Sequence, residues 1–355
     1  MRERLSKSIT YKCGLFAITA VMAGAPSCTK DPFKNVPGGC TVTINLNGGQ
    51  TRTKATDPLH DTLGVSGGIK ELLIYLFDGN TDNIVSFKRV SDPDSLVGIK
   101  IKTTIGPKKI YILANAHIGD GIGVFTDFDF GKLQTSLIDE EPGYFTMAGK
   151  KLDFYADVNS VADISLERFV SKVVLNSLKT DFAGSPYSGM VLKDVKVYLI
   201  NVASKKMIHN GAETAPNSMI NLGSNVPAGY SGAHIANMIY DSILSDIGDL
   251  VYTTKHHFYT YANTTATENS YIKFTKLVIE ATLNGTKYYY PIPVNKTGFG
   301  TSNNGGILRN TVYIMDVVIK NAGSPTPGSF PPSSSYQTNL SVIPFNSFTL
   351  GSIEI

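Results

Sequence analysis

Apolar and polar residues alternate with a period of two in the first regular segment of the chain, Cys40–Asn47. Val42, Ile44 and Leu46 fall on one face of this segment, and threonines and asparagines fall on the other. Such alternation is typical of a strand that buries one face. Two glycines follow the segment, and we predict that the first strand ends there.

Many more apolar runs of strand length follow, and turn residues separate them. Asn284-Gly285 lies between two of these runs and favours the positive φ angles of a type I′ turn, which predicts a hairpin. Only residues 231–250 have a spacing of apolar residues that suits a helix. Many short strands with turns between them indicate an all-β fold built of sandwiches. We predict further strands at residues 69–77, 84–90, 97–105, 109–115, 144–148, 152–157, 169–178, 192–202, 256–261, 272–283, 286–294, 311–319 and 340–355.

The length of 355 residues favours two domains over one. A weak internal repeat, in which a short alternating strand precedes a longer one with a tyrosine near its end, places the domain boundary near residues 158–165. A Pro/Ser-rich stretch at 324–335 is typical of a linker. We therefore predict an N-terminal sandwich at 55–162, a C-terminal sandwich at 163–335 and a C-terminal strand extension at 336–355.

The composition indicates a folded β protein without a nucleic-acid surface. Hydrophobic residues make up 42% and charged residues 17% of the chain, which is typical of a globular protein. Tyr and Phe are frequent and suit strands, while Trp is absent. The formal charge of +3 is small and no basic stripe accompanies it, so we expect no nucleic-acid partner.

Residues 1–27 have the features of an export signal. Basic residues are followed by a short apolar stretch and then by small residues directly before Cys28. The apolar stretch is shorter than the ~20 residues that a membrane-spanning helix needs. Cys28 stands where a lipoprotein signal peptidase cuts, and we expect acyl chains there that anchor the chain to a membrane. An ordinary secretory signal with an unmodified Cys28 is the alternative.

Candidate catalytic and metal-binding residues are few. His256 and His257 are neighbours on a predicted strand, so they point to opposite faces, and we interpret them as an exposed pair. An acidic cluster lacks the spacing of an EF-hand, and we interpret it as a solvated loop rather than a calcium site. The cluster consists of Asp127, Asp129, Asp139, Glu140 and Glu141. We predict no catalytic residue, metal or cofactor, and therefore no enzyme.

Several stretches, taken in order, resemble the fimbrillins, the major-subunit family of the type V pilus of Bacteroides- and Porphyromonas-type bacteria. Ala148 and Ser171 depart from the residues usual in the family at two of these stretches. The stretches are Lys109–Ala116, which ends a strand in Ala-Asn, Phe145–Gly149, Leu166–Val173, Phe258–Asn263 and Arg309–Lys320. The resemblance runs from the signal to the last strand.

The resemblance implies two transthyretin-like β-sandwich domains and export as an outer membrane lipoprotein precursor. It also implies cleavage by an Arg- or Lys-specific protease and assembly with other copies and related pilins into a cell-surface fimbrium by strand exchange. Arg52 and Lys54 directly follow the strand that carries Val42, Ile44 and Leu46. Cleavage after either residue is expected to release residues 28–54 as a propeptide and to open an apolar groove.

The C-terminal runs alternate in a way that suits a strand donated to a neighbouring subunit. Their apolar residues are Leu340, Val342, Phe345, Phe348, Leu350, Ile353 and Ile355. An ordinary last strand that pairs within its own domain is the alternative. Two other functions stay open: a tip or accessory pilin of the same pilus, and a monomeric surface lipoprotein that binds a ligand.

Overall fold

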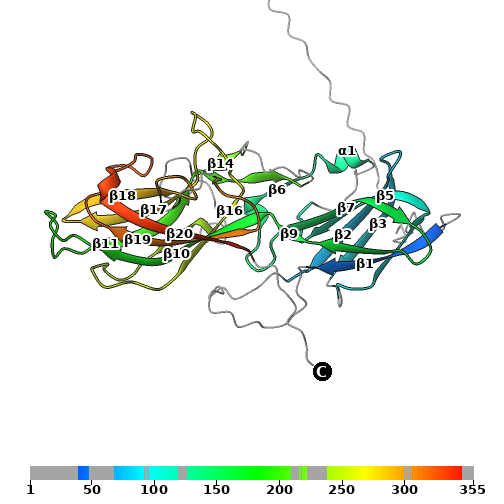
Figure 1. Cartoon of the computed structure of the whole chain (residues 1–355), viewed down its shortest axis with the longest axis horizontal. Helices are drawn as coiled ribbons and strands as arrows, with labels where there is room; N and C mark the ends of the chain where they lie inside the picture. Colours follow the sequence, from blue (N-terminus) through cyan, green and yellow to red (C-terminus); the bar gives the residue numbers. More distant parts are fainter. Residues whose placement is uncertain are drawn as a thin grey trace, which may run out of the picture.

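The computed structural model describes residues 39–47, 68–91, 93, 96–118, 126–208, 216, 218–221, 238–299, 301 and 305–345. Strands dominate these residues, which confirms the predicted all-β class. Two β lobes lie end to end along the long axis of the molecule (Figure 1). None of the helices in the described ranges combines the length and the apolar character needed to cross a bilayer.

The N-terminal lobe packs a three-stranded sheet against a five-stranded sheet. The smaller sheet has the order β4-β1-β8, with β1 at Gly39–Asn47, β4 at Ile99–Thr104 and β8 at Val161–Ser165. The larger sheet has the order β3-β2-β5-β7-β9. Its strands are β2 (Glu71–Asp78), β3 (Ile84–Ser91), β5 (Gly106–Ala114), β7 (Met147–Ala156) and β9 (Glu167–Arg168).

Strand β2 is buried on both faces, because a separate core lies on each side of it. Leu72, Ile74 and Leu76 join the core between the two sheets of the N-terminal lobe. The alternate residues, including Tyr75, join a second core that continues into the C-terminal lobe. Helix α1 (Asp127–Phe130) covers this face, and the Phe130 ring centroid lies 5.2 Å from that of Tyr75.

The C-terminal lobe packs two four-stranded sheets together, with the orders β16-β10-β19-β20 and β15-β11-β17-β18. The predicted hairpin is confirmed: Leu283 pairs with Thr286, and the φ angles of Asn284 and Gly285 are 50° and 75°. The strands are β10 (Val170–Thr180), β11 (Lys193–Ile200), β15 (Tyr240–Ser242), β16 (His256–Tyr261), β17 (Lys276–Leu283), β18 (Thr286–Pro293), β19 (Thr311–Ile319) and β20 (Tyr336–Pro344).

Short elements complete the fold and tie the lobes together. Strand β6 (Gln134–Ser136), which follows α1, pairs with β13 (Lys205–Met207) of the C-terminal lobe. Strands β12 (Val202–Ala203) and β14 (Met219–Ile220) form a second small pair. The 3-10 helices η1 (Leu137–Asp139) and η2 (Ser333–Ser335) precede Glu140 and β20.

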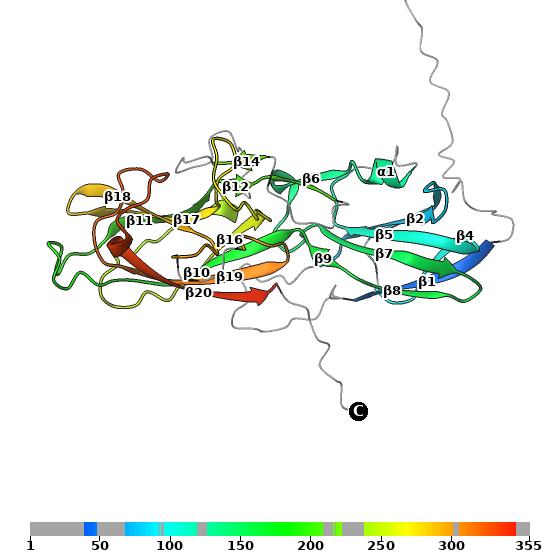
Figure 2. The same cartoon turned by 45° about the horizontal axis from the view of Figure 1, so that its top comes forward.

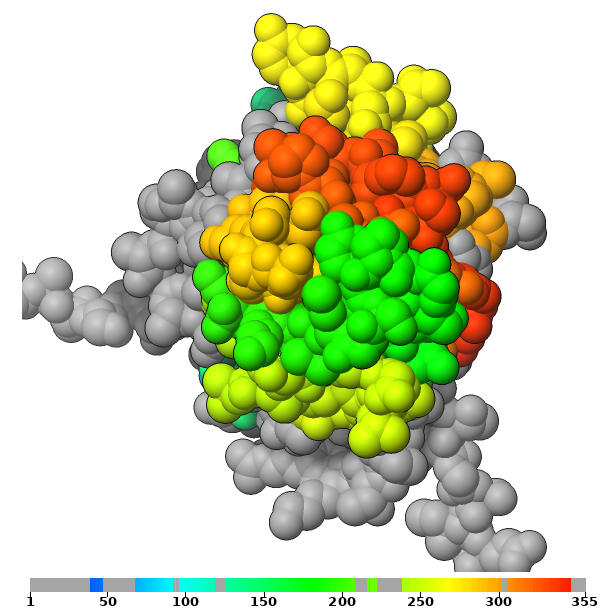
Figure 3. All heavy atoms as spheres, turned by 90° about the vertical axis from the view of Figure 1, so that its left-hand side faces the viewer, coloured from blue at the N-terminus to red at the C-terminus, as the bar shows by residue number. Residues whose placement is uncertain are grey.

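The far end of the C-terminal lobe is closed by turns between its strands. The turn after β10 (green) and the loop that leads to β20 (orange-red) meet there, above the yellow-green segment that precedes β16 (Figure 3). Ile243 and Ile247 of that segment are buried in the core, whereas Leu244 and Leu250 are exposed. The segment therefore exposes Leu244, Leu250 and Val251, while Ile243 and Ile247 anchor it to the core.

The structure shifts two of the predicted boundaries. The boundary between residues 162 and 163 falls inside β8, and both β8 and β9 pair with strands of the N-terminal lobe, so the chain changes lobe between Arg168 and Val170. The two strands predicted at 144–148 and 152–157 form one strand, β7. Of the helical range 231–250, only residues from 238 onwards are described, and β15 lies there.

Candidate functional site

Strand β1 is the middle strand of the smaller N-terminal sheet. It pairs antiparallel with β4 and parallel with β8. Val42 and Ile44 are 0% exposed and Leu46 is 4% exposed, so the predicted apolar face is buried in the core between the sheets. Cys40 lies on the same face as a free thiol, and burial raises its pKa. Loss of β1 would therefore uncover a strip of core and leave β4 and β8 unpaired along facing edges.

The structure does not describe the residues predicted to be lipidated or cleaved. Cys28, Arg52 and Lys54 fall outside the described residues. Their predicted roles in lipidation and cleavage therefore stay predictions. The structure describes β1 only up to Asn47, five residues before Arg52.

Strand β20 lies at the edge of its sheet and is paired with β19 over its whole length, from Tyr336↔Ile319 to Pro344↔Thr311. Leu340 packs against the core, whereas Val342 is 46% exposed. The described chain ends at Phe345, which also packs against the core. The remaining predicted donor residues, Phe348, Leu350, Ile353 and Ile355, lie outside the described residues.

Strand β20 runs towards the junction of the two lobes, where β9 lies (Figure 2). The backbone N–H of Phe345 donates to the Asn310 carbonyl over 2.8 Å. The Arg168 side chain, which is 5% exposed, donates from Nη1 to the Phe345 carbonyl over 3.2 Å. The end of the last strand is thus held by a residue of the N-terminal lobe.

A second arginine crosses the junction in the opposite direction. Arg309, which lies in the turn that leads into β19, donates from Nη2 to Glu167 Oε2 over 2.6 Å. Neither Arg168 nor Arg309 stands out in the sequence as a candidate site residue. Both nevertheless lie in stretches that carry the resemblance to fimbrillins, and that was the one signal that could have singled them out.

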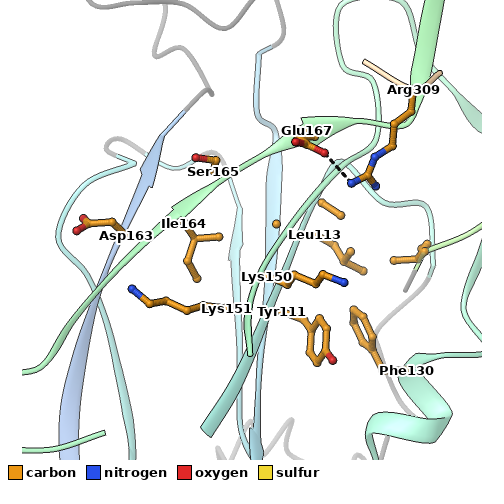
Figure 4. A pocket seen from close by; sticks show the side chains of 13 residues that line it. Tyr111, Leu113, Phe130, Lys150, Lys151, Asp163, Ile164, Ser165, Glu167 and Arg309 are labelled. Atoms are coloured by element: carbon orange, nitrogen blue, oxygen red, sulfur yellow. Dashed lines mark hydrogen bonds and ion pairs between the residues drawn. The ribbon is translucent and has the colours of Figure 1, made fainter. Parts of the chain in front are cut away.

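A cavity of about 490 Å³ lies beside this ion pair (Figure 4). Both labelled carboxylates are engaged: Glu167 with Arg309, and Asp163 Oδ1 with the Asn45 side chain of β1 over 2.9 Å. The cavity therefore offers no pair of unengaged carboxyl groups for acid–base chemistry. Its lining residues are Tyr111, Leu113, Phe130, Ala148, Gly149, Lys150, Lys151, Asp163, Ile164, Ser165, Glu167, Ile208 and Arg309.

The structure corrects the interpretation of two polar groups. His256 is buried rather than exposed: its Nδ1 lies 2.6 Å from Asp241 Oδ2 and its Nε2 lies 2.9 Å from the Tyr252 hydroxyl. Glu140 of the acidic cluster is also buried. Across the described ranges, no three His, Cys, Asp or Glu side chains lie close enough together to hold a metal ion.

Three other members of the acidic cluster, Asp127, Asp129 and Glu141, have separate structural roles. Asp127 pairs with Lys109 over 2.9 Å, and Glu141 pairs with Lys70 over 2.8 Å. The Asp129 side chain completes a capping box with Thr126 at the start of α1. Local packing and capping therefore account for these carboxylates.

Comparison with known proteins identifies relatives of this chain. Residues 40–161 match the family model described as "Major fimbrial subunit protein (FimA)". The "Major fimbrium subunit FimC" of Porphyromonas gingivalis is 26% identical over 328 residues, which cover 87% of this chain and 66% of the relative. The resemblance to the fimbrillins is confirmed. This chain spans just under two thirds of the length of that curated relative.

Solved structures show the same fold at low identity. A fimbrilin (FimA) from Porphyromonas gingivalis W83 aligns with a TM-score of 0.63 and 16% identity, covering 86% of this chain and 97% of that one. A structure from Bacteroides eggerthii, described as a candidate cell adhesion protein, aligns with a TM-score of 0.65 and 20% identity, covering 88% and 98%. At these identities the likeness concerns the fold alone.

Proposed function

We propose that this chain is a structural subunit of a cell-surface fimbrium that polymerises by protease-activated strand exchange and supports adhesion. The observation that carries the proposal is the position of β1. It is a middle strand with a buried apolar face, and Arg52 and Lys54 follow it in the sequence. The matched relatives named as fimbrium subunits support the same function. The role is structural and involves no catalysis.

Release of β1 explains how a precursor that does not polymerise becomes an assembling subunit. Burying each aliphatic side chain of β1 contributes roughly 1.5–3 kcal/mol, so the open groove is unfavourable until another strand fills it. Unpaired backbone groups of β4 and β8 add to the cost. A strand from a second copy can satisfy both, and repetition of this head-to-tail contact gives a filament.

The donor in this proposal is the C-terminal segment that begins with β20. Its predicted apolar residues recur at intervals of two or three residues, close to the period of two in β1. Before processing, acyl chains on Cys28 hold the precursor at the outer membrane. An Arg/Lys-specific protease then frees the subunit from the anchor and opens its groove in one step.

The test is cleavage of purified precursor with an Arg/Lys-specific protease. We expect loss of a fragment that contains Gly39–Asn47, followed by a ladder of oligomers. The double variant Arg52→Ala, Lys54→Ala should stay monomeric under the same treatment, and Lys70→Ala, at the next basic residue along the chain, serves as the control. A wild-type chain that loses the fragment yet forms no oligomers would contradict the proposal.

The pairing of β20 favours a second candidate, a tip or accessory subunit of the same fimbrium. All nine residues of β20 pair with β19 of the same chain, as expected of a subunit that donates no strand. Such a subunit accepts a strand after cleavage but adds no further copy. Mixing cleaved chain with a polymerising pilin would then give capped oligomers and no homopolymer, whereas a monomeric lipoprotein would give neither.

A further inference from the structure

The end of β20 is held at the lobe junction by a buried cation. Arg168 is 5% exposed, and its guanidinium carbon lies 4.9 Å from the centroid of the Phe345 ring while its Nη1 bonds the Phe345 carbonyl. One side chain thus makes a cation–π contact and a charge-assisted hydrogen bond with the same residue. Within the part of the chain that the structure describes, no carboxylate forms an ion pair with Arg168.

Burial of an arginine without a carboxylate is costly, so its partners matter. Burial lowers the pKa of Arg168 to about 10, and the side chain is still protonated at neutral pH. The Phe345 carbonyl and ring compensate this charge in part, beside the favourable electrostatic effect of Tyr259. The contact therefore stabilises both the buried arginine and the end of the strand.

The position of Arg168 in the fold makes this contact specific to the C-terminal strand. Arg168 belongs to β9, which pairs with β7 of the N-terminal lobe at Met147↔Arg168. Strand β20, by contrast, is bonded along one edge to β19 alone. The Arg168 contact is the support that the N-terminal lobe gives to an edge strand of the other lobe.

We propose that Arg168 is a latch that keeps the C-terminal strand docked on its own subunit until assembly. This inference rests on the proposed strand exchange, in which β20 must leave β19 or extend away from it. The latch keeps β20 from opening in the precursor, and breaking it is a step in donating the strand.

The experiment is hydrogen exchange of the uncleaved full chain, followed by mass spectrometry of the peptide that spans Tyr336–Phe345. In Arg168→Gln we expect exchange in this peptide to rise on the order of tenfold, because a hydrogen bond to a charged group is lost. Exchange in β10 should stay unchanged. Arg89→Gln, which breaks the Arg89–Glu71 pair near the edge of the five-stranded sheet opposite β9, is the matched control and should leave β20 as in the wild type.

A second variant tests the same contact if Arg168→Gln does not fold. Phe345→Leu keeps an apolar side chain but removes the ring, and we expect a rise of about threefold in the same peptide. Unchanged exchange of β20 in both variants overturns the latch. If Arg168→Gln does not fold, unchanged exchange of β20 in Phe345→Leu alone overturns it.

Oligomer formation separates the latch from the proposed function. After cleavage, Arg168→Gln should form the ladder several times faster than the wild type, whereas uncleaved Arg168→Gln stays monomeric because β1 fills its groove. If the cleaved wild type forms no ladder, the proposed function fails, and the exchange of uncleaved chain still decides the latch. Equal rates for cleaved wild type and cleaved variant overturn the latch alone.

Discussion

Glu140 is a carboxyl group buried between the lobes, and its bonds join them. Its Oε2 accepts from the Thr146 backbone over 2.8 Å, and its Oε1 accepts from the Tyr261 hydroxyl over 2.7 Å. Thr146 belongs to the N-terminal lobe and Tyr261 to β16 of the other. Burial raises the pKa of Glu140 from its usual 4.5 to about 7, since removing the carboxylate from water outweighs these hydrogen bonds.

This shift predicts that stability falls as pH rises. Because the folded chain holds the Glu140 proton more tightly than the unfolded chain, its contribution is fully present below about pH 4.5 and is lost as pH rises through about 7. The loss is on the order of 3 kcal/mol. We expect Glu140→Gln to flatten the pH dependence of the free energy of unfolding, measured in urea from pH 5 to 8.

The amide of the variant fits the same partners. Its oxygen can accept from Thr146, while the Tyr261 hydroxyl donates to Thr135 Oγ1, 3.1 Å away. Glu141→Gln at the neighbouring exposed site should keep the slope of the wild type. The same pH slope in Glu140→Gln and the wild type would assign the effect to another group.

At the scale of single elements, β1 stabilises the folded chain and is also the strand that we expect cleavage to release. Ile44→Ala should lower the free energy of unfolding by about 2–5 kcal/mol, because the side chain is fully buried. Cleaved Ile44→Ala should also release its first strand faster than the wild type. Thr43→Ala, on the opposite and partly exposed face of the same strand, should change stability by about 1 kcal/mol or less. Denaturant unfolding and the time course of fragment release measure the two effects.

Local patterns predicted the elements that depend on neighbouring residues, such as β1, β16 and the Asn284-Gly285 hairpin. Strands β8 and β9 escaped prediction because they are short and gain their order from distant partners, as when β8 pairs with β1. Many contacts at the lobe junction escaped prediction for the same reason. Arg168 and Phe345 are 177 residues apart, and Glu140 and Tyr261 are 121 apart, so no spacing along the chain connects them.

At the scale of the whole molecule, one core runs through both lobes. It contains Tyr75 and Phe145 of the N-terminal lobe and Tyr259 of the C-terminal lobe. The rings of Phe145 and Tyr259 lie 4.7 Å apart between centroids. The β6–β13 pair and the Arg309–Glu167 ion pair add further links. A filament subunit that transmits tension from one end to the other needs such continuity, since each lobe would carry one of the two exchanged strands.

The shared core predicts that both lobes unfold in one cooperative transition. Phe145→Ala should lower the free energy of unfolding by about 3–5 kcal/mol and should also split the transition in two, because it removes the ring that packs on Tyr259. Phe154→Ala is the matched control, since Phe154 belongs to the core within the N-terminal lobe. It should destabilise the chain without separating the lobes. Calorimetry distinguishes the two outcomes, and two transitions in the wild type would show that the lobes are independent domains.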